Sequence, residues 1–531
     1  MKKWCVLVFT IVIIMVSFAS LSFPSNAQTN SGNYGSLTWE FDENSRVLTI
    51  TGKGEMENNP FLDIPWNLYE DKIECVIIEN GVTTISSDAF RGCYNLTSVE
   101  IPNSVTEIGS EAFSHCNNLT NITIPDSVTE IGYKAFYYCT NLQSVEIGCD
   151  VAAIGTEAFS SCDNLTYFFV NEHNTVYRSI DGNLYSKDGK NLIQYAIGKT
   201  APNFVIPDGV TSISDSAFSG CDSLTKIVIP DSVITIESGA FYQTGYYNDE
   251  SNWENNALYI DNCLIQVEQS TSGEYIIKPG TKTIAASAFY YCSDITSVEI
   301  PDSVVTIGAH AFAGSGLTSI EIPSSVSLID SGAFWHCENL TSIKLPDSAL
   351  VIEGSAFRGC WSLTSIEIPY SVLTIGDGAF SECDNLSQIT FLSPNTIIED
   401  NEKDSIYDHK TIPSHVTIYA YSNSKAEEYA NQYHLKFVSL GSVPVTEGPD
   451  TDVPVTDAPV TNAPVTEAPT TEVPAMITHQ NLSDMNKPPH NNNAPSADQD
   501  TNTSMIVIAT LGVCVVGLAI ALIAVMLRKK K

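Results

Sequence analysis

Apolar residues recur in one pattern through the central part of the chain, with a period of about 23 residues. The unit from Leu119 to Asn141 reads LTNITIPDSVTEIGYKAFYYCTN, with apolar residues at its first, fourth and sixth positions and a turn at Pro-Asp-Ser. A second short apolar stretch, a glycine and an Ala-Phe pair follow. The phenylalanine of this pair stands at residues 90, 113, 136, 159, 218, 241, 289, 312, 334, 357 and 380.

The repeat predicts a stacked architecture. A single unit is too short to bury its own apolar residues, but stacked copies form a continuous core with parallel strands about 4.8 Å apart. The pattern therefore predicts a β-rich solenoid of about 13 to 15 coils, about 65 Å long. Side chains alternate along a strand, so Ile122 and Ile124 are expected to face the core and Thr123 to face outward.

The full unit can be written L-x-x-[IV]-x-I-P-x-S-V-x-x-I-G-x-x-A-F-x-x-C-x-[ND]. It resembles the BspA-type leucine-rich repeat of secreted and surface proteins from gut and oral bacteria, and the resemblance covers about residues 73–392. The resemblance implies a right-handed leucine-rich repeat solenoid, a cell-surface function in binding or adhesion to matrix proteins, host cells or other microbes, and no shared catalytic residues. It leaves the ligand open, because members of the family differ in what they bind.

Two departures from the period predict inserts near residues 171–200 and 245–275. The step from Phe159 to Phe218 fits either two coils with extra residues or one coil with a longer insert, and Asp188-Gly189 there predicts a hairpin turn. Aromatic residues gather in both inserts and are candidate contacts for a protein or a sugar. The simpler alternative is that they pack against the coils. They are Tyr177, Tyr185 and Tyr195 in the first insert, and Tyr246, Tyr247, Trp253 and Tyr259 in the second.

The outward position of each strand forms a row along the predicted stack. This row is a candidate ligand face for a basic protein or for Ca²⁺, or a solvated polar face that keeps the sheet soluble. No D-x-[DN]-x-[DN]-G loop supports a dedicated calcium site. The row consists of Glu100, Thr123, Glu146, Val228, Glu299, Glu321, Lys344, Glu367 and Thr390.

Nine of the 14 cysteines stand three residues after the repeat phenylalanine. Stacked copies place their Cβ vectors parallel, whereas a disulfide needs them to converge. We therefore interpret these cysteines as buried, unpaired core residues, and leave pairing of Cys75, Cys149 or Cys263 open. A serine in the turn, such as Ser127, is expected to hydrogen-bond backbone groups from coil to coil.

The remaining segments differ from the repeat in composition. An apolar run behind two lysines predicts a secretion signal, and 23 residues without a charge, followed by a basic tail, predict one transmembrane helix with an external N-terminal part. The Pro/Thr-rich stretch before it favours an extended, disordered stalk. The predicted segments are 1–27 (signal), 28–72 (N-terminal cap), 393–440 (C-terminal cap), 441–504 (linker), 505–527 (transmembrane helix) and 528–531 (cytoplasmic tail).

The charge and the absence of catalytic motifs narrow the range of functions that the chain can have. Residues 28–504 hold all 62 acidic residues but only 19 of the 25 basic ones, a formal net charge of −43, which argues against nucleic-acid binding. Neither G-x-S-x-G nor H-E-x-x-H occurs, and no catalytic, cofactor or metal set stands out. We predict a non-catalytic, membrane-anchored surface protein that binds an extracellular protein or glycan. The alternative is a structural spacer or self-association protein of the envelope.

Overall fold

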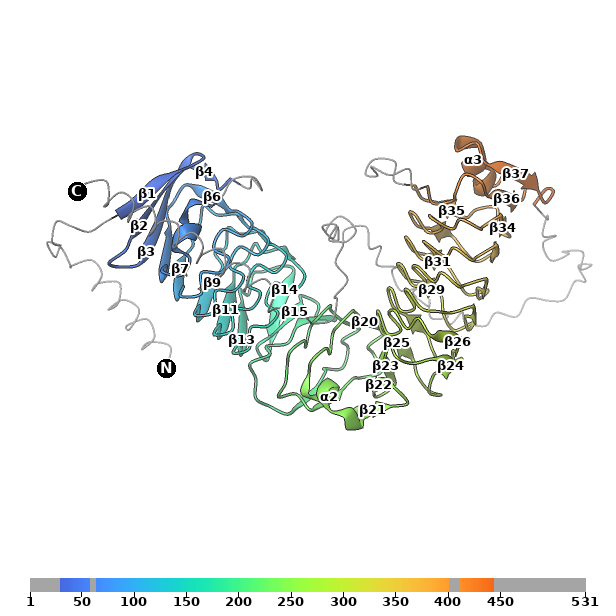
Figure 1. Ribbon diagram of the computed structural model, residues 1–531, viewed down its shortest axis with the longest axis horizontal. Helices are drawn as coiled ribbons and strands as arrows, with labels where there is room; N and C mark the ends of the chain where they lie inside the picture. The colour runs from blue at the N-terminus through green and yellow to red at the C-terminus, as the bar shows by residue number, and fades with distance from the viewer. Residues whose placement is uncertain (1–28, 58–63, 401–409, 444–531) are drawn as a thin grey trace, which may run out of the picture. The chain divides into compact units, whose positions relative to one another are not determined.

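The computed structural model describes residues 29–57, 64–400 and 410–443 (Figure 1). The predicted signal, the predicted transmembrane helix with its basic tail, and the linker from residue 444 onward lie outside these residues. Within the described ranges, no helix combines the length and apolar character needed to cross a bilayer.

Strands of the repeat lie in two columns that run along the stack. The long-strand column comes from the L-x-x-I-x-I segment of each unit and contains β5 (Cys75–Ile78), β7 (Ser98–Glu100), β9 (Asn121–Thr123), β11 (Ser144–Ile147), β13 (Tyr167–Val170), β17 (Asn203–Val205), β19 (Lys226–Val228), β24 (Gly273–Ile276), β26 (Ile295–Glu299), β28 (Ser319–Glu321), β30 (Ser342–Lys344), β32 (Ser365–Ile368) and β34 (Gln388–Phe391).

The short-strand column comes from the apolar pair after the Pro-Asp-Ser turn. It contains β6 (Val82–Ile85), β8 (Glu107–Ile108), β10 (Glu130–Ile131), β12 (Ala153–Ile154), β18 (Ser212–Ile213), β20 (Thr235–Ile236), β25 (Thr283–Ile284), β27 (Thr306–Ile307), β29 (Leu328–Ile329), β31 (Val351–Ile352), β33 (Thr374–Ile375) and β35 (Ile397–Ile398). The ladders within both columns are parallel, for example Val145 opposite Ile122 and Ile131 opposite Ile108. This arrangement confirms the predicted β-solenoid.

The repeat phenylalanines form a stack inside the coils. The rings of Phe113 and Phe136 are 5.2 Å apart and nearly parallel, and both side chains are fully buried. Equivalent ring contacts of 4.8 to 5.5 Å run from Phe289 to Phe380. Each coil therefore completes the core of its neighbour, and no coil has a core of its own.

The turn serines bond one coil to the next, as the repeat predicts, and the buried cysteines, predicted only as unpaired core residues, do so as well. All twelve cysteines in the described part of the chain are free, including Cys75, Cys149 and Cys263. The Cys139 thiol donates to the Phe113 carbonyl oxygen of the preceding coil at 3.2 Å, and the Ser127 hydroxyl donates to the Val105 carbonyl oxygen at 2.7 Å. Burial raises the pKa of Cys139 to about 12, so the thiol stays protonated and available as a donor.

Caps cover both described ends of the stack. At the N-terminal end the antiparallel strands β1 (Thr29–Tyr34), β2 (Leu37–Asp42) and β3 (Val47–Gly52) continue the sheet onto β5, while β4 (Gly54–Glu55) pairs with β6. The 3-10 helix η1 (Pro65–Tyr69) places Trp66 on Phe90, 5.9 Å between rings. These elements cover apolar core that an open solenoid end would expose.

At the other end, β36 (Thr417–Ala420) pairs with β34, and β37 (Lys436–Ser439) pairs with β36. Helix α3 (Lys425–Gln432) begins at the cap Ser424, whose hydroxyl accepts the Glu427 amide hydrogen. Its buried Ala426, Tyr429 and Ala430 belong to the core. Helix α3 and strand β37 thus cover this end of the stack.

The two inserts each supply a strand to the short-strand column. In the first, β14 (Tyr177–Ile180), β15 (Asn183–Ser186) and β16 (Asn191–Gln194) form an antiparallel meander, and β16 pairs in parallel with β18. In the second, α2 (Gly245–Asn248), η2 (Glu250–Asn252) and β21 (Trp253–Glu254) precede β22 (Ala257–Ile260) and β23 (Cys263–Val267), and β23 pairs with β25. The first long step therefore contains two coils with an added hairpin.

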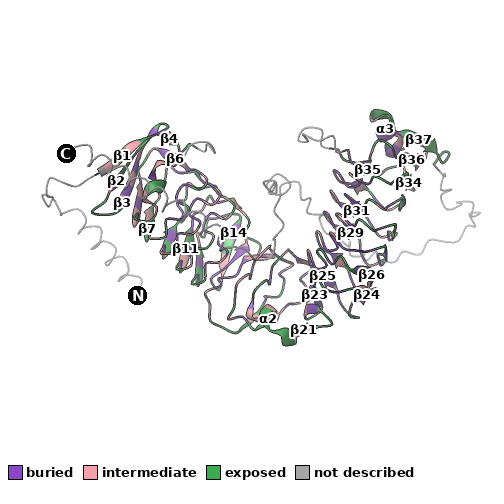
Figure 2. Cartoon of the chain, viewed as in Figure 1, coloured by how far each residue is buried: buried purple, intermediate pink, exposed green. Residues whose placement is uncertain are grey.

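Both inserts interrupt the long-strand column and the core. The Gly182 carbonyl oxygen, at the β14–β15 turn, accepts the Phe168 amide hydrogen of β13, and the Asp261 carboxylate, at the β22–β23 turn, accepts the Ile229 amide hydrogen after β19. The buried apolar residues accordingly form three clusters, and at each insert one cluster ends and the next begins. Purple buried and green exposed segments are interspersed on the coils on both sides of these junctions (Figure 2).

Candidate ligand-binding face

The outward row of the long-strand column is exposed at most of its positions, and only Val228 and Thr390 of the row are half-buried. Thr123 lies opposite Glu146 and Glu367 lies opposite Thr390 in the parallel register, and Glu100 and Glu299 are exposed on their strands. The neighbouring Ile122 and Ile124 are buried. The alternation of the strands thus holds these side chains on one face without any part in the core.

Neighbouring residues of the row pair with one another. The Thr123 hydroxyl donates to the Glu146 carboxylate at 3.1 Å, and the Lys344 ammonium forms a salt bridge with Glu321. This hydrogen-bonded pairing raises the pKa of Lys344. Across the described residues, no group of three His, Cys, Asp or Glu side chains is placed to hold a metal ion.

A groove of about 670 Å³ lies over part of this row, across β24, β26, β28 and β30. Glu299, Glu321 and Lys344 of the predicted row line it, together with Ile276 of β24, which is 67% exposed. The turns that follow the strands, Pro-Asp-Ser after β26 and β30 and Pro-Ser-Ser after β28, form its wall. The wall residues include Asp302, Pro323, Ser324, Pro346 and Asp347. The groove therefore combines an exposed apolar side chain with carboxylates on its floor and wall.

The middle of the row is apolar, which the sequence interpretation missed. Phe169 is 50% exposed and Val205 is 64% exposed, and the Phe169 ring lies 4.2 Å from that of Tyr167. These residues stand at the outward position of strands beside the inserts, where the repeat pattern is weakest. The signal was present as apolar residues at that position in YFFV and NFV.

The first insert does not present its tyrosines to solvent. Tyr177, Tyr185 and Tyr195 are buried, at 9%, 0% and 1% exposure, so the prediction that they are surface contacts is wrong for this insert. The physical reason is that β15 and β16 occupy core positions of a coil. The ring of Tyr195 takes the place of a repeat phenylalanine and lies 5.2 Å from Phe218.

The aromatic residues of the second insert are half-buried and hold one another in place. The Tyr246 hydroxyl donates to the Tyr259 carbonyl oxygen at 2.9 Å, and the Trp253 indole N–H donates to the Tyr247 carbonyl oxygen at 2.8 Å. The side chains of all four remain partly accessible to solvent. This insert therefore offers a rigid, partly exposed aromatic surface.

The repeat itself identifies the family. A model of the BspA-type leucine-rich repeat region matches six copies, over residues 67–187, 197–271 and 282–404, which is more than half of the chain. The chain belongs to the BspA-type leucine-rich repeat family. Its membership rests on this match along the repeats and agrees with the two strand columns and the phenylalanine stack of the BspA-type coils.

Several solved structures are similar to this BspA-type chain. A leucine-rich repeat protein from Eubacterium ventriosum is 23% identical with a TM-score of 0.39, and the similarity covers 72% of this chain and 99% of that chain. A leucine-rich cell surface protein from Faecalibacterium prausnitzii is 27% identical with a TM-score of 0.30, covering 73% and 100%. The pneumococcal vaccine antigen PcpA is 14% identical with a TM-score of 0.29, covering 78% and 99%. A search of curated proteins found no match.

Proposed function

We propose that this chain is a surface-displayed, non-catalytic binding protein that holds a basic extracellular protein in the groove over β24, β26, β28 and β30. The predicted signal, stalk and transmembrane helix would display the solenoid outside the cell, as the sequence suggests. The observation that supports this proposal is the groove itself, in which the exposed Ile276 lies opposite Glu299 in the parallel register and Glu321 is a further lining residue. An extended segment with lysine or arginine next to an apolar side chain complements this lining.

The charge of the protein supports the same partner. The sequence as a whole has a formal net charge of −37, so a basic partner is attracted over a distance and an acidic one is repelled. Charged groups at an open groove mainly set specificity and the rate of association, while the apolar contact supplies affinity. Both kinds of contact are available within this one groove.

The test compares two charge-reversal variants of the full chain displayed on cells, probed with a panel of basic matrix proteins and with lysine-rich extended peptides. We expect Glu299→Lys combined with Glu321→Lys to weaken binding at least about tenfold. Glu100→Lys combined with Glu146→Lys is the matched control, because these residues stand in the same row outside the groove. Equal losses in both variants, or no binding by the parent chain, would contradict the groove proposal.

A second candidate function is self-association through the apolar middle of the row. The exposed Phe169 and Val205 favour it, because exposed apolar side chains of this kind are buried when two copies meet. Sedimentation of the full chain in detergent would then show dimers that Phe169→Glu dissociates. A monomer at all concentrations would remove this candidate without affecting the groove.

A further inference from the structure

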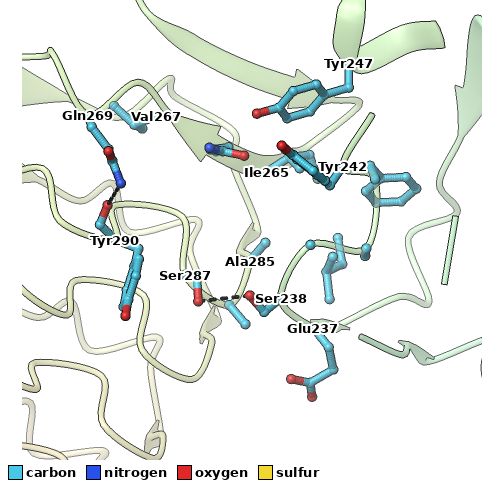
Figure 3. A pocket seen from close by; sticks show the side chains of 16 residues that line it. Glu237, Ser238, Tyr242, Tyr247, Ile265, Val267, Gln269, Ala285, Ser287 and Tyr290 are labelled. Carbon is cyan, nitrogen blue, oxygen red and sulfur yellow. Dashed lines mark hydrogen bonds between the residues drawn. The ribbon is translucent and has the colours of Figure 1, made fainter. Parts of the chain in front are cut away.

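A pocket of about 190 Å³ lies at the second junction, between the residues that follow β20 and the strand β23 (Figure 3). Tyr242, Tyr247 and Tyr290 are among its lining residues, together with Gln266 and Gln269. It is separate from the groove, with which it shares no lining residue. Nothing in the proposed function uses it.

The pocket lies where the phenylalanine stack is interrupted. Val267 of the second insert and Tyr195 of the first insert occupy equivalent positions. The Val267 amide donates to the Ala288 carbonyl oxygen at 2.8 Å, and the Tyr195 amide donates to the Ala217 carbonyl oxygen at 2.9 Å. Each of these alanines directly precedes the repeat phenylalanine of its coil. At the first junction the Tyr195 ring fills the space beside Phe218. At the second, the smaller Val267 lines the pocket, and the phenylalanine stack stops at Phe241 and resumes at Phe289.

Aromatic rings border the pocket and are held in position. Tyr242 is 47% exposed, and its ring lies 5.4 Å from that of Tyr247 in an edge-on arrangement. Tyr247 is fixed from behind by Trp253, 5.3 Å between rings, and its amide hydrogen bonds to the Thr244 hydroxyl that caps helix α2. Tyr290 is 38% exposed on the other side. Rigid rings of this kind bind a flat apolar surface at little cost in conformational entropy.

Neutral polar groups supply the remaining lining. The Gln269 amide donates to the Tyr290 carbonyl oxygen at 3.2 Å, and the Ser238 hydroxyl donates to that of Ser287 at 3.1 Å (Figure 3). The sixteen lining residues include no lysine or arginine, and the one carboxylate, Glu237, points away from the labelled tyrosines. This lining suits a neutral ligand rich in hydroxyl groups and does not suit an anion.

We propose that this pocket binds a neutral six-membered sugar ring of a glycan. Such a ring has C–H faces that pack on tyrosine rings and equatorial hydroxyl groups that bond to amides and hydroxyls. A dry apolar cavity of about 150 Å³ accepts benzene, so a pocket of 190 Å³ has room for one ring with its hydroxyl groups. A neutral ligand of this size and few contacts is expected to bind with a dissociation constant on the order of 1 mM.

The experiment measures saturation-transfer NMR of the full chain with the methyl glycosides of glucose, galactose, mannose and N-acetylglucosamine. We expect saturable binding of at least one glycoside, weakened at least about tenfold by Tyr290→Ala and by Val267→Tyr, which restores the ring found at the first junction. Tyr291→Ala is the matched control, because Tyr291 is 47% exposed beside Tyr290 but does not line the pocket. Circular dichroism checks that each variant is folded.

Three outcomes would overturn the proposal. They are the absence of glycoside binding, binding that folded Tyr290→Ala leaves unchanged, and displacement of the glycoside by benzene or phenol at lower concentration, which would assign the pocket to an apolar ring. The groove variant Glu299→Lys with Glu321→Lys is expected to leave glycoside binding unchanged. Failure of the groove proposal and failure of this one can therefore be told apart.

Discussion

In the regular coils from Phe90 to Phe159, neighbouring phenylalanine rings lie 5.1 to 5.4 Å apart, whereas at the two insert junctions that succession is broken. The first junction restores it with Tyr195, and the second leaves a pocket beside Val267. The regular coils thus devote their side chains to stacking. At the junctions some residues do not take part in this stacking. The exposed apolar middle of the outward row and the aromatic pocket both lie beside the junctions.

The largest expected effect separates the two regions by stability. Phe136→Ala removes a ring packed on both sides and should lower the free energy of unfolding by about 3–5 kcal/mol. Phe241→Ala, at the edge of the pocket, loses a ring stacked on one side and should cost about 1 kcal/mol less. Urea denaturation followed by circular dichroism measures both. An equal cost would show that the pocket is filled as tightly as a regular coil.

The second prediction uses pH. Burial, with a smaller contribution from the nearby Asp330 and Asp215, raises the pKa of Glu237 at the second junction from its ordinary 4.5 to about 7. The folded chain therefore holds this proton more tightly than the unfolded chain does. Glu237 contributes stability that is fully present below pH 4.5 and is lost as the pH rises to about 7, at most about 3 kcal/mol.

Glu237→Gln should remove this slope, so the variant becomes more stable than the parent at pH 8 and gains little at pH 4.5. Urea midpoints between pH 4.5 and pH 8 give the difference. Glu100→Gln, at an exposed position of the regular coils, is the control and should leave the pH profile of the parent in place. Parallel profiles of parent and Glu237→Gln would show that Glu237 is hydrated at the junction.

The third prediction concerns the thiols. In a regular coil the Cys139 thiol donates to its carbonyl oxygen at 3.2 Å, whereas Cys292 beside the second junction is 3.7 and 3.9 Å from two carbonyl oxygens. Replacement of Cys139 by alanine should therefore cost about 1 kcal/mol, and replacement of Cys292 about half as much. Alkylation of the native chain by iodoacetamide, mapped by peptide mass, should also modify Cys292 faster, because local opening is easier at the junction.

The same comparison explains what could be predicted from the sequence. The coils, the free cysteines and the outward row follow from the repeat, because each position is surrounded by copies of itself. The buried positions of the insert tyrosines do not follow from the repeat, because Tyr185 and Tyr195 occupy core positions only when β15 and β16 are part of the stack. The pocket depends on the equivalence of Val267 and Tyr195, which becomes visible through their hydrogen bonds to Ala288 and Ala217 and not through their spacing.

The smallest effect on stability is expected on the outward row. The salt bridge of Lys344 and Glu321 is exposed, with about 70% of each side chain accessible, and solvent screens such pairs so strongly that they contribute little to stability. Lys344→Ala should accordingly leave the urea midpoint almost unchanged while it removes the one basic side chain among the groove-lining residues of the structure. Binding of a basic ligand in the groove should then tighten by a few-fold, because Glu321 is released from its pair. Weaker binding instead would mean that Lys344 itself contacts the ligand, and that the groove holds an acidic group of the partner.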